Sequence, residues 1–172
     1  DKLEGNTRVP ARYLRKPFNL NSKKVRKATL YICGLGFYET YINGKKIGDQ
    51  VLAPTPTDYS KSVKYNRFDV TGQLLKGANA IGVILGNGRY TSMRMPGVRH
   101  FDVPKMIAQL EVYYEDGEKR VIASDASWKI TAEGPIGTNN EFDGEEYDAR
   151  KEMPGWNTYP FDDTKWLQAE VV

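Results

Sequence analysis

Two acidic residues of this chain, Glu39 and Asp58, lie in segments that can meet if the polypeptide folds as an antiparallel sheet. Two carboxyl groups separated by roughly 5 to 10 Å can hydrolyse a glycosidic bond, provided that one of them stays protonated. Among 22 acidic residues, however, such a pair will often form by chance. The pair is therefore compatible with a glycosidase but is not sufficient to identify one.

Catalysis by a nucleophile has even less support in the sequence. His100 is the sole histidine, and no Gly-x-Ser-x-Gly elbow presents a serine to it. Cys33 is the sole cysteine and lies in an apolar stretch, which favours a buried packing residue over a reactive thiol. Gly86 and Gly88 lack the third glycine and the helix of a dinucleotide-binding loop. We therefore expect no catalytic residues in this segment.

Three other segments are better suited to binding a sugar. A sugar packs its apolar face on an aromatic ring, while its hydroxyls pair with carboxylates, amides and guanidinium groups. Residues 34–39, 50–60 and 87–104 contain this mixture of side chains. The candidate carbohydrate-binding residues are Tyr38, Glu39, Asp58, Asn87, Arg89 and Tyr90, with Arg94 and Arg99 further along the third segment. The alternative is structural: the tyrosines cover the core edge, Asp58 caps a turn and the arginines are solvated.

Strand-like sequence separates these three segments. We expect strands at residues 25–33, 38–42, 45–49, 63–68, 80–85, 105–114, 118–124 and 128–131. The pairs Asn43-Gly44 and Asp116-Gly117 favour the tight turns of β-hairpins, and Thr71 is placed to cap a single helical turn. If consecutive strands alternate in direction, the three segments lie together at one end of the sheets, where binding residues are commonly found.

Short strands with turn signals between them, and no long amphipathic helix, predict an all-β fold. The expected architecture is an antiparallel β-sandwich of the jelly-roll type, similar to galactose-binding domains. A chain of 172 residues, 40% of them hydrophobic, is long enough for one domain with its own core. Residues 133–172 are expected to form an irregular tail packed on the sandwich, because their aromatic side chains need a surface to bury. The acidic residues between 141 and 146 are expected to form a solvated loop.

Charge and hydropathy exclude several classes of partner. The 25 basic and 22 acidic side chains give a formal charge of +3 and are interspersed, which argues against nucleic acid. No stretch approaches the run of about 18 apolar residues that spans a bilayer, so we expect no membrane partner. The chain begins with neither Met nor a signal peptide. We therefore expect a piece of a longer protein, whose cellular compartment the sequence leaves open.

Several blocks of the sequence resemble the amino-terminal β-sandwich domain of bacterial α-L-rhamnosidases. The first blocks are residues 11–18 (ARYLRKPF), 34–49 (GLGFYETYINGKKIGD) and 85–90 (LGNGRY). Residues 144–150 (GEEYDAR), 155–156 (GW) and 161–166 (FDDTKW) are similar to the segment that leads toward the rest of such enzymes. The resemblance covers nearly the whole chain.

This resemblance implies a noncatalytic accessory domain of a multidomain glycoside hydrolase, whose catalytic carboxylates lie in a separate α/α-barrel domain. It implies either contact with an L-rhamnose-containing glycan or a purely architectural domain that packs on the barrel without binding sugar. In some members the related module uses a calcium ion, which needs about six to eight oxygen ligands. Glu39, Asp58 and Asn87 can supply some oxygens, but no local loop specifies a calcium site, so we expect no metal or other cofactor.

Overall fold

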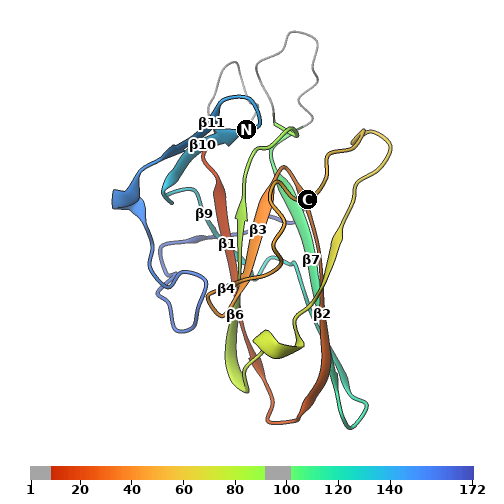
Figure 1. Ribbon diagram of the computed structural model, residues 1–172. Coiled ribbons are helices and arrows are strands. Elements are labelled where there is room, and N and C mark those ends of the chain that lie inside the picture. Colours follow the sequence, from red (N-terminus) through yellow and green to blue (C-terminus); the bar gives the residue numbers. More distant parts are fainter. Residues whose placement is uncertain (1–8, 92–101) are drawn as a thin grey trace.

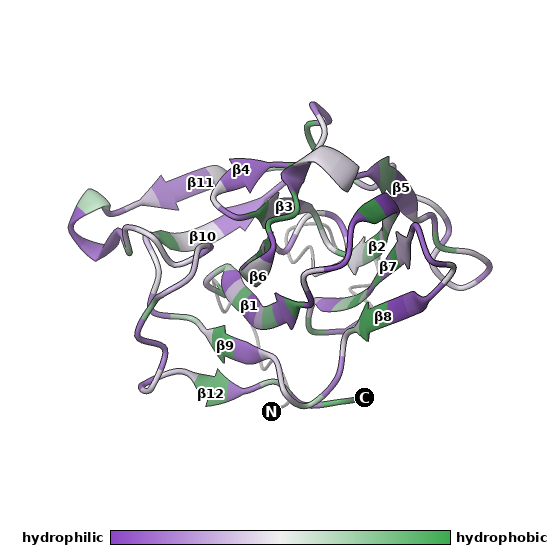
Figure 2. Ribbon diagram, turned by 90° about the horizontal axis from the view of Figure 1, so that it is seen from below, coloured by the Kyte–Doolittle hydropathy of each residue, from purple (hydrophilic) through white to green (hydrophobic). Residues whose placement is uncertain are grey.

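Two antiparallel sheets face each other in the computed structural model of this chain, which describes residues 9–91 and 102–172 (Figure 1). The six-stranded sheet contains, in spatial order, β12 (Leu167–Gln168), β9 (Lys129–Thr131), β1 (Arg12–Leu20), β6 (Gly77–Leu85), β3 (Tyr38–Ile42) and β4 (Lys45–Lys46). The four-stranded sheet contains β5 (Asn66–Asp69), β2 (Val25–Leu35), β7 (Lys105–Tyr114) and β8 (Lys119–Ala123). Figure 2 shows the four-stranded sheet on one side of the molecule and β1, β6 and β3 beside it.

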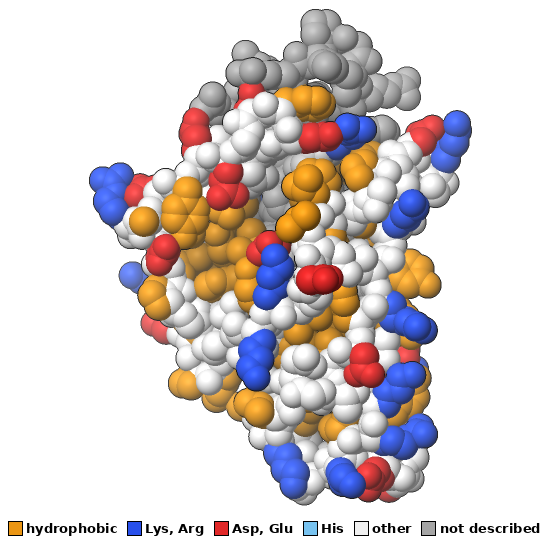
Figure 3. Space-filling view, viewed as in Figure 1, with side chains coloured by type: hydrophobic (Ala, Val, Ile, Leu, Met, Phe, Trp, Pro, Cys, Tyr) orange, Lys and Arg blue, Asp and Glu red, His pale blue; other side chains and the backbone are white. Residues whose placement is uncertain are grey.

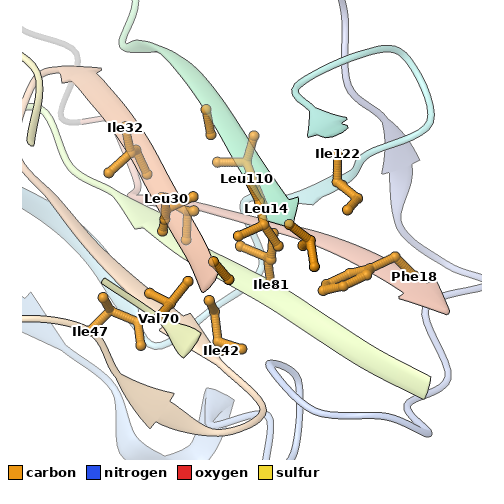
Figure 4. Packing of buried hydrophobic residues seen from close by; sticks show 14 of the residues in the cluster. Leu14, Phe18, Leu30, Ile32, Ile42, Ile47, Val70, Ile81, Leu110 and Ile122 are labelled. Carbon is orange, nitrogen blue, oxygen red and sulfur yellow. The ribbon is translucent and has the colours of Figure 1, made fainter. Parts of the chain in front are cut away.

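The main core lies between these two sheets. Alternate residues of a strand point to opposite faces, so every second side chain enters the core. Leu30 of β2 and its partner Leu110 of β7 are fully buried there, as are Ile81 and Val83 of β6 (Figure 4). The predicted all-β, antiparallel jelly-roll sandwich is confirmed, and the described residues contain short 3-10 turns but no α-helix.

Two predicted strands, at 38–42 and 105–114, have the predicted bounds, whereas other predictions are wrong in detail. The strand expected at 63–68 is Asn66–Asp69, and the strand expected at 45–49 ends at Lys46, shortly before Gly48 adopts a φ of 76°. Thr71 does not cap its 3-10 turn (η1, Thr71–Gln73), because the preceding Val70 occupies the cap position. The Thr71 hydroxyl instead accepts a hydrogen bond from the Ala28 amide at 2.8 Å.

Strand β1 was not predicted from the sequence, since its charged residues and Pro17 obscure the alternation. A proline removes one ladder donor and is tolerated where no neighbouring strand needs it. β9 pairs only with the Tyr13 to Arg15 part of β1, so at Pro17 the single partner is β6. A central strand can therefore contain this proline.

Residues 133–172 are more regular than the expected irregular tail. They contain a two-stranded sheet of β10 (Ile136–Asn140) and β11 (Gly144–Tyr147), a 3-10 turn (η2, Ala149–Lys151) and β12. Their hydrophobic side chains pack on the face of the six-stranded sheet that points away from the main core. This second cluster consists of Ala11, Tyr13, Ile84, Ile136, Met153, Trp156, Phe161 and Trp166. The six-stranded sheet is consequently covered on both faces. The organisation of residues 1–172 as a single domain stays a prediction.

Candidate functional site

The three segments singled out in the sequence meet at one end of the sandwich, the upper end in Figure 1. The Tyr38 amide of the first segment donates to the Ala53 carbonyl of the second at 2.8 Å. Tyr59 of the second segment packs edge-on against Tyr90 of the third, with 5.3 Å between ring centroids. β2 runs antiparallel to both β5 and β7, and β3 runs antiparallel to β6. The segments that connect these strands therefore lie at the same end of the sandwich.

Gly36 allows the first and third segments to approach so closely. Its φ of 125° is disfavoured for residues with a side chain, and a Cβ there would lie 2.1 Å from the Gly86 carbonyl oxygen. The Gly86 amide in turn donates to the Phe37 carbonyl at 2.7 Å. Direct contact between the backbones at residues 36–37 and at Gly86 therefore fixes how these two parts of the loop end lie.

Two candidate binding residues, Tyr38 and Asn87, are buried, with 5% and 4% of their surface exposed. The Tyr38 hydroxyl donates to Asn66 Oδ1 at 2.8 Å. Asn87 Nδ2 donates to the Val9 carbonyl at 2.6 Å, and the Asn87 amide donates to Asn139 Oδ1 at 2.7 Å. Both side chains join separate segments of the chain, and Tyr90 is buried as well. Their role in sugar contact stays a prediction.

Glu39 is half-exposed and sits on β3 beside two partners. Its carboxylate accepts a hydrogen bond from the Tyr41 hydroxyl at 2.7 Å and forms an ion pair with Lys46. Burial raises the pKa of Glu39, but the hydrogen bonds from Lys46 and Tyr41 outweigh burial and hold the pKa below its usual 4.5. Glu39 is therefore an ionised acceptor at neutral pH and is unsuited to act as a general acid.

Asp58 and Arg89 are each engaged by the protein itself. The Asp58 carboxylate accepts from the Ser60 hydroxyl at 2.6 Å and pairs with Lys61 at 3.1 Å, and these contacts lower its pKa. This arrangement is the turn-capping alternative considered for Asp58 in the sequence. Arg89 donates through Nε to Glu141 at 2.6 Å in a two-pronged ion pair, which ties the third segment to the β10–β11 turn. Arg94, Arg99 and His100 lie outside the described residues.

A groove of about 920 Å³ opens beside this end, between the six-stranded sheet and the β10–β11 hairpin. Its floor is aromatic and aliphatic, with Tyr13, Tyr41, Ile84 and Trp156 among the lining side chains. Hydrophobic side chains gather on this part of the surface with acidic ones beside them (Figure 3). Of the predicted binding residues, Tyr38 and Glu39 line the groove, whereas Asp58, Asn87, Arg89 and Tyr90 do not.

Trp156 is held in the floor of the groove by other rings. Its ring meets those of Tyr13 and Tyr41 edge-on, with centroid distances of 5.1 and 5.9 Å, and lies nearly parallel to Trp166 at 6.4 Å. The Trp156 ring also packs against the backbone of β6 at Gly82, where an added Cβ would lie 2.7 Å from the ring. The groove thus has a rigid aromatic floor.

Arg15 fastens the segment that carries Trp156 to strand β1. Its guanidinium is 1% exposed and donates to the Trp156 carbonyl at 2.8 Å and to the Thr158 carbonyl at 2.9 Å. It also forms an ion pair with Asp163 and lies over the Phe161 ring, 5.1 Å from its centroid. A buried cation needs such complete pairing, since an unpaired one is strongly destabilising.

Four carboxylates line the groove, on Glu39, Glu141, Glu145 and Glu152. The sequence predicted a solvated loop for the acidic residues between 141 and 146, and the structure places two of them along the groove. Glu145 and Tyr147 share one face of β11, since they are two residues apart. The Tyr147 hydroxyl donates to Glu152 at 2.7 Å. The rim therefore offers hydrogen-bond acceptors above an apolar floor.

Among the residues that the structure describes, the candidate oxygen donors do not fit the calcium ion that the family resemblance implies. Calcium requires converging oxygen atoms, but the carboxylates of Glu39 and Asp58 are held by separate protein partners. Asn87 donates through Nδ2 to the Val9 carbonyl, and its buried Oδ1, which has no partner among the described residues, is a single candidate ligand. In the described ranges, no three acidic, histidine or cysteine residues are arranged to hold a metal ion. The expected absence of a cofactor stays a prediction.

Sequence inspection missed Tyr147, Trp156 and the amides of Asn139 and Asn140 as groove residues. The aromatic residues after position 140 were noted as surface that must be buried, but nothing local showed which sheet face they would cover. An aromatic cluster within a glycine-rich and acidic stretch is the signal that could have marked the groove. Among the described residues, no helix is long and apolar enough to span a membrane.

Comparison with known proteins places this arrangement in a family. The family model for the α-L-rhamnosidase N-terminal domain matches residues 23–172. An α-L-rhamnosidase of Formosa agariphila is 42% identical over 163 residues, covering 91% of this chain and 17% of that protein.

Two solved structures are similar as well. That of Streptomyces avermitilis α-L-rhamnosidase complexed with L-rhamnose has a TM-score of 0.89 and 41% identity, and the match covers 94% of this chain and 16% of that one. That of the α-L-rhamnosidase from Aspergillus terreus has a TM-score of 0.90 and 38% identity over 96% of this chain and 19% of that one. The family is thus not confined to bacteria, and this chain spans less than a fifth of the length of these relatives. The chain belongs to the α-L-rhamnosidase N-terminal domain family and is an accessory domain of that kind.

Proposed function

We propose that this chain is the accessory domain of a larger α-L-rhamnosidase and contacts an L-rhamnose-containing glycan through the groove beside the loop end of the sandwich. The observation that carries the proposal is the combination, in one groove, of a fixed aromatic floor with a rim of carboxylates and amides. The structure of the Streptomyces avermitilis relative was solved with L-rhamnose, which supports a rhamnoside as the ligand.

The groove matches the two chemical sides of a sugar. The apolar C–H face of a pyranose packs on an aromatic ring, and Tyr147 is 52% exposed beside Trp156. The sugar hydroxyls are donors and acceptors, and carboxylates and side-chain amides complement them. Glu145 and Asn139 bring such groups to the same groove, whereas the Asn140 amide is hydrogen-bonded within the hairpin turn. A groove that binds sugar without catalysis is compatible with an accessory domain. The partner of this domain would be the catalytic domain of the same polypeptide.

Calorimetric titration of this chain with a rhamnose-terminated oligosaccharide tests the proposal. We expect saturable binding that Tyr147→Ala weakens at least about fivefold, the loss that corresponds to ~1 kcal/mol of aromatic contact. Tyr65→Ala is the matched control, because Tyr65 is a 66% exposed tyrosine that packs on Tyr31 of the four-stranded sheet. Absence of binding by the unaltered chain, or an equal loss in both variants, would overturn the proposal.

The architectural alternative is favoured by one specific observation. Val51 and Leu52, in the loop after β4, are 78% and 64% exposed, and Leu52 has a φ of 53°. Adjacent exposed aliphatic side chains are typical of contact surfaces. If this loop docks on the catalytic domain, Val51→Ser will lower the melting temperature of the complete enzyme while leaving that of this chain alone unchanged. Equal effects on the two proteins would exclude a docking role.

A further inference from the structure

The groove carries a charge pattern that bears on its ligand. Four glutamates line it, and within residues 9–91 and 102–172 no lysine or arginine does. Glu39 and Glu141 are paired with Lys46 and Arg89, cations that stand outside the lining. Two negative charges on the rim are thereby compensated by the protein itself.

Glu145 and Glu152 differ from this pair. Glu152 accepts a hydrogen bond from the neutral Tyr147 hydroxyl, and in the described part of the chain neither glutamate forms an ion pair. Their charge reaches the floor of the groove: burial raises the pKa of Tyr13, and the negative charges of Glu145 and Glu152 raise it further. Two carboxylates without an ionic partner therefore stand on this side of the groove, and no described cation lines it.

Resting on the proposed glycan contact, we propose that the groove selects an uncharged sugar chain and rejects one that carries a uronic acid next to its rhamnose, because Glu145 and Glu152 repel a ligand carboxylate. Hydroxyl groups donate hydrogen bonds to carboxylates, whereas a uronate brings a second anion to the same surface. Discrimination by like-charge repulsion needs no additional contact with the preferred ligand.

The test compares a rhamnosyl-glucose disaccharide with the matched rhamnosyl-glucuronate by calorimetry at neutral pH and low ionic strength. We expect the glucuronate to bind about tenfold more weakly, and the ratio to fall as salt is added, since exposed charges are screened. The double variant Glu145→Gln, Glu152→Gln should bring the two affinities together. Glu118→Gln is the control, because Glu118 lies in the β7–β8 hairpin and pairs with Lys23.

The outcomes separate this inference from the proposed function. Equal affinities for the two disaccharides, tighter binding of the glucuronate, or a ratio that the double variant does not change would overturn the charge selection and leave the glycan-binding role standing. Absence of binding by both disaccharides would overturn the proposed function and the charge selection with it.

Discussion

Arg15 connects the sequence of strand β1 to the geometry of the groove. Its buried guanidinium bonds to two carbonyls of the Trp156 segment and to the Asp163 carboxylate. An apolar residue at position 15 would leave those carbonyls without this donor. A charged residue in a central strand thus stabilises a distant segment of the chain, which strand propensity alone does not predict.

The first prediction concerns this buried pair. Asp163→Asn should lower the free energy of unfolding by about 3 kcal/mol, because the Arg15 charge then lacks its carboxylate in a buried site. Chemical denaturation at neutral pH measures the difference. Glu115→Gln is the control: Glu115 pairs with Lys24 on the surface, where the loss should be about 0–1 kcal/mol. Similar losses in both variants would contradict a structural role for the buried pair.

The second prediction concerns the pH dependence of Glu39. Its folded-state pKa is depressed below 4.5, so its ionised form stabilises the fold above that pH and the contribution is lost as the pH falls through the depressed value. Unaltered protein should be more stable than Glu39→Gln at pH 7, and the gap should close below pH 4.5. Denaturation curves at a series of pH values measure it, and a gap that is constant down to pH 3 would contradict this account.

Single residues also show how far the sequence could predict the site. The sequence predicted correctly that the segments beginning at residues 34, 50 and 87 meet at one end of the sandwich, because strand direction follows from counting turns. It left open whether Tyr38 packs on the core or contacts sugar, and it could not reveal that Asn87 is buried. The hydrogen-bond partners of the two side chains, Asn66 and Val9, are distant in sequence. Burial is a tertiary property, and residue type alone leaves it open.

At the scale of elements, strand β6 determines where the groove floor can lie. Gly82 sits in its middle, and the Trp156 ring occupies the space that a side chain would fill. Because protein interiors are closely packed, a large ring can lie directly against a strand only where the strand has no side chain in that place. The glycine thus explains why the 156–157 segment rests against β6.

The third prediction follows from this contact. Gly82→Ala should lower the free energy of unfolding by about 1–3 kcal/mol and change tryptophan fluorescence, because the new Cβ would overlap the Trp156 ring. Gly137→Ala in β10 is the matched control, since its nearest neighbour would be the Glu146 carbonyl oxygen at 3.8 Å. If both variants behave alike, the ring does not rest on β6 as described.

Elements with clear alternation were predictable and others were not. β3 and β7 alternate buried and exposed side chains, and turn residues bound them. β1 carries Arg15 and Pro17 at positions that break the pattern, so it was overlooked. β10 and β11 form a hairpin around exposed acidic residues, and the hairpin contacts Asn87 and Arg89 of the loop end. Strand propensity in this glycine-rich and acidic stretch is low, so its pairing could not be predicted from the sequence.

At the scale of the whole molecule, the chain is a sandwich with a second layer over one sheet. The main core lies between the sheets, and the aromatic cluster of residues 133–172 covers the outer face of the six-stranded sheet. The groove lies at the margin of that second layer, next to the loop end. The chain spans under a fifth of the length of its α-L-rhamnosidase relatives.

Chemical-shift mapping by NMR during titration with a rhamnose-terminated oligosaccharide tests the central claim most directly, since it reports each face of the molecule separately. We predict shifts of the Trp156 indole N–H and of the Tyr147 and Asn139 amides, with the amides of β2 and β5 unchanged. Shifts confined to the four-stranded sheet, or no shifts at a saturating sugar concentration, would contradict glycan contact through the groove.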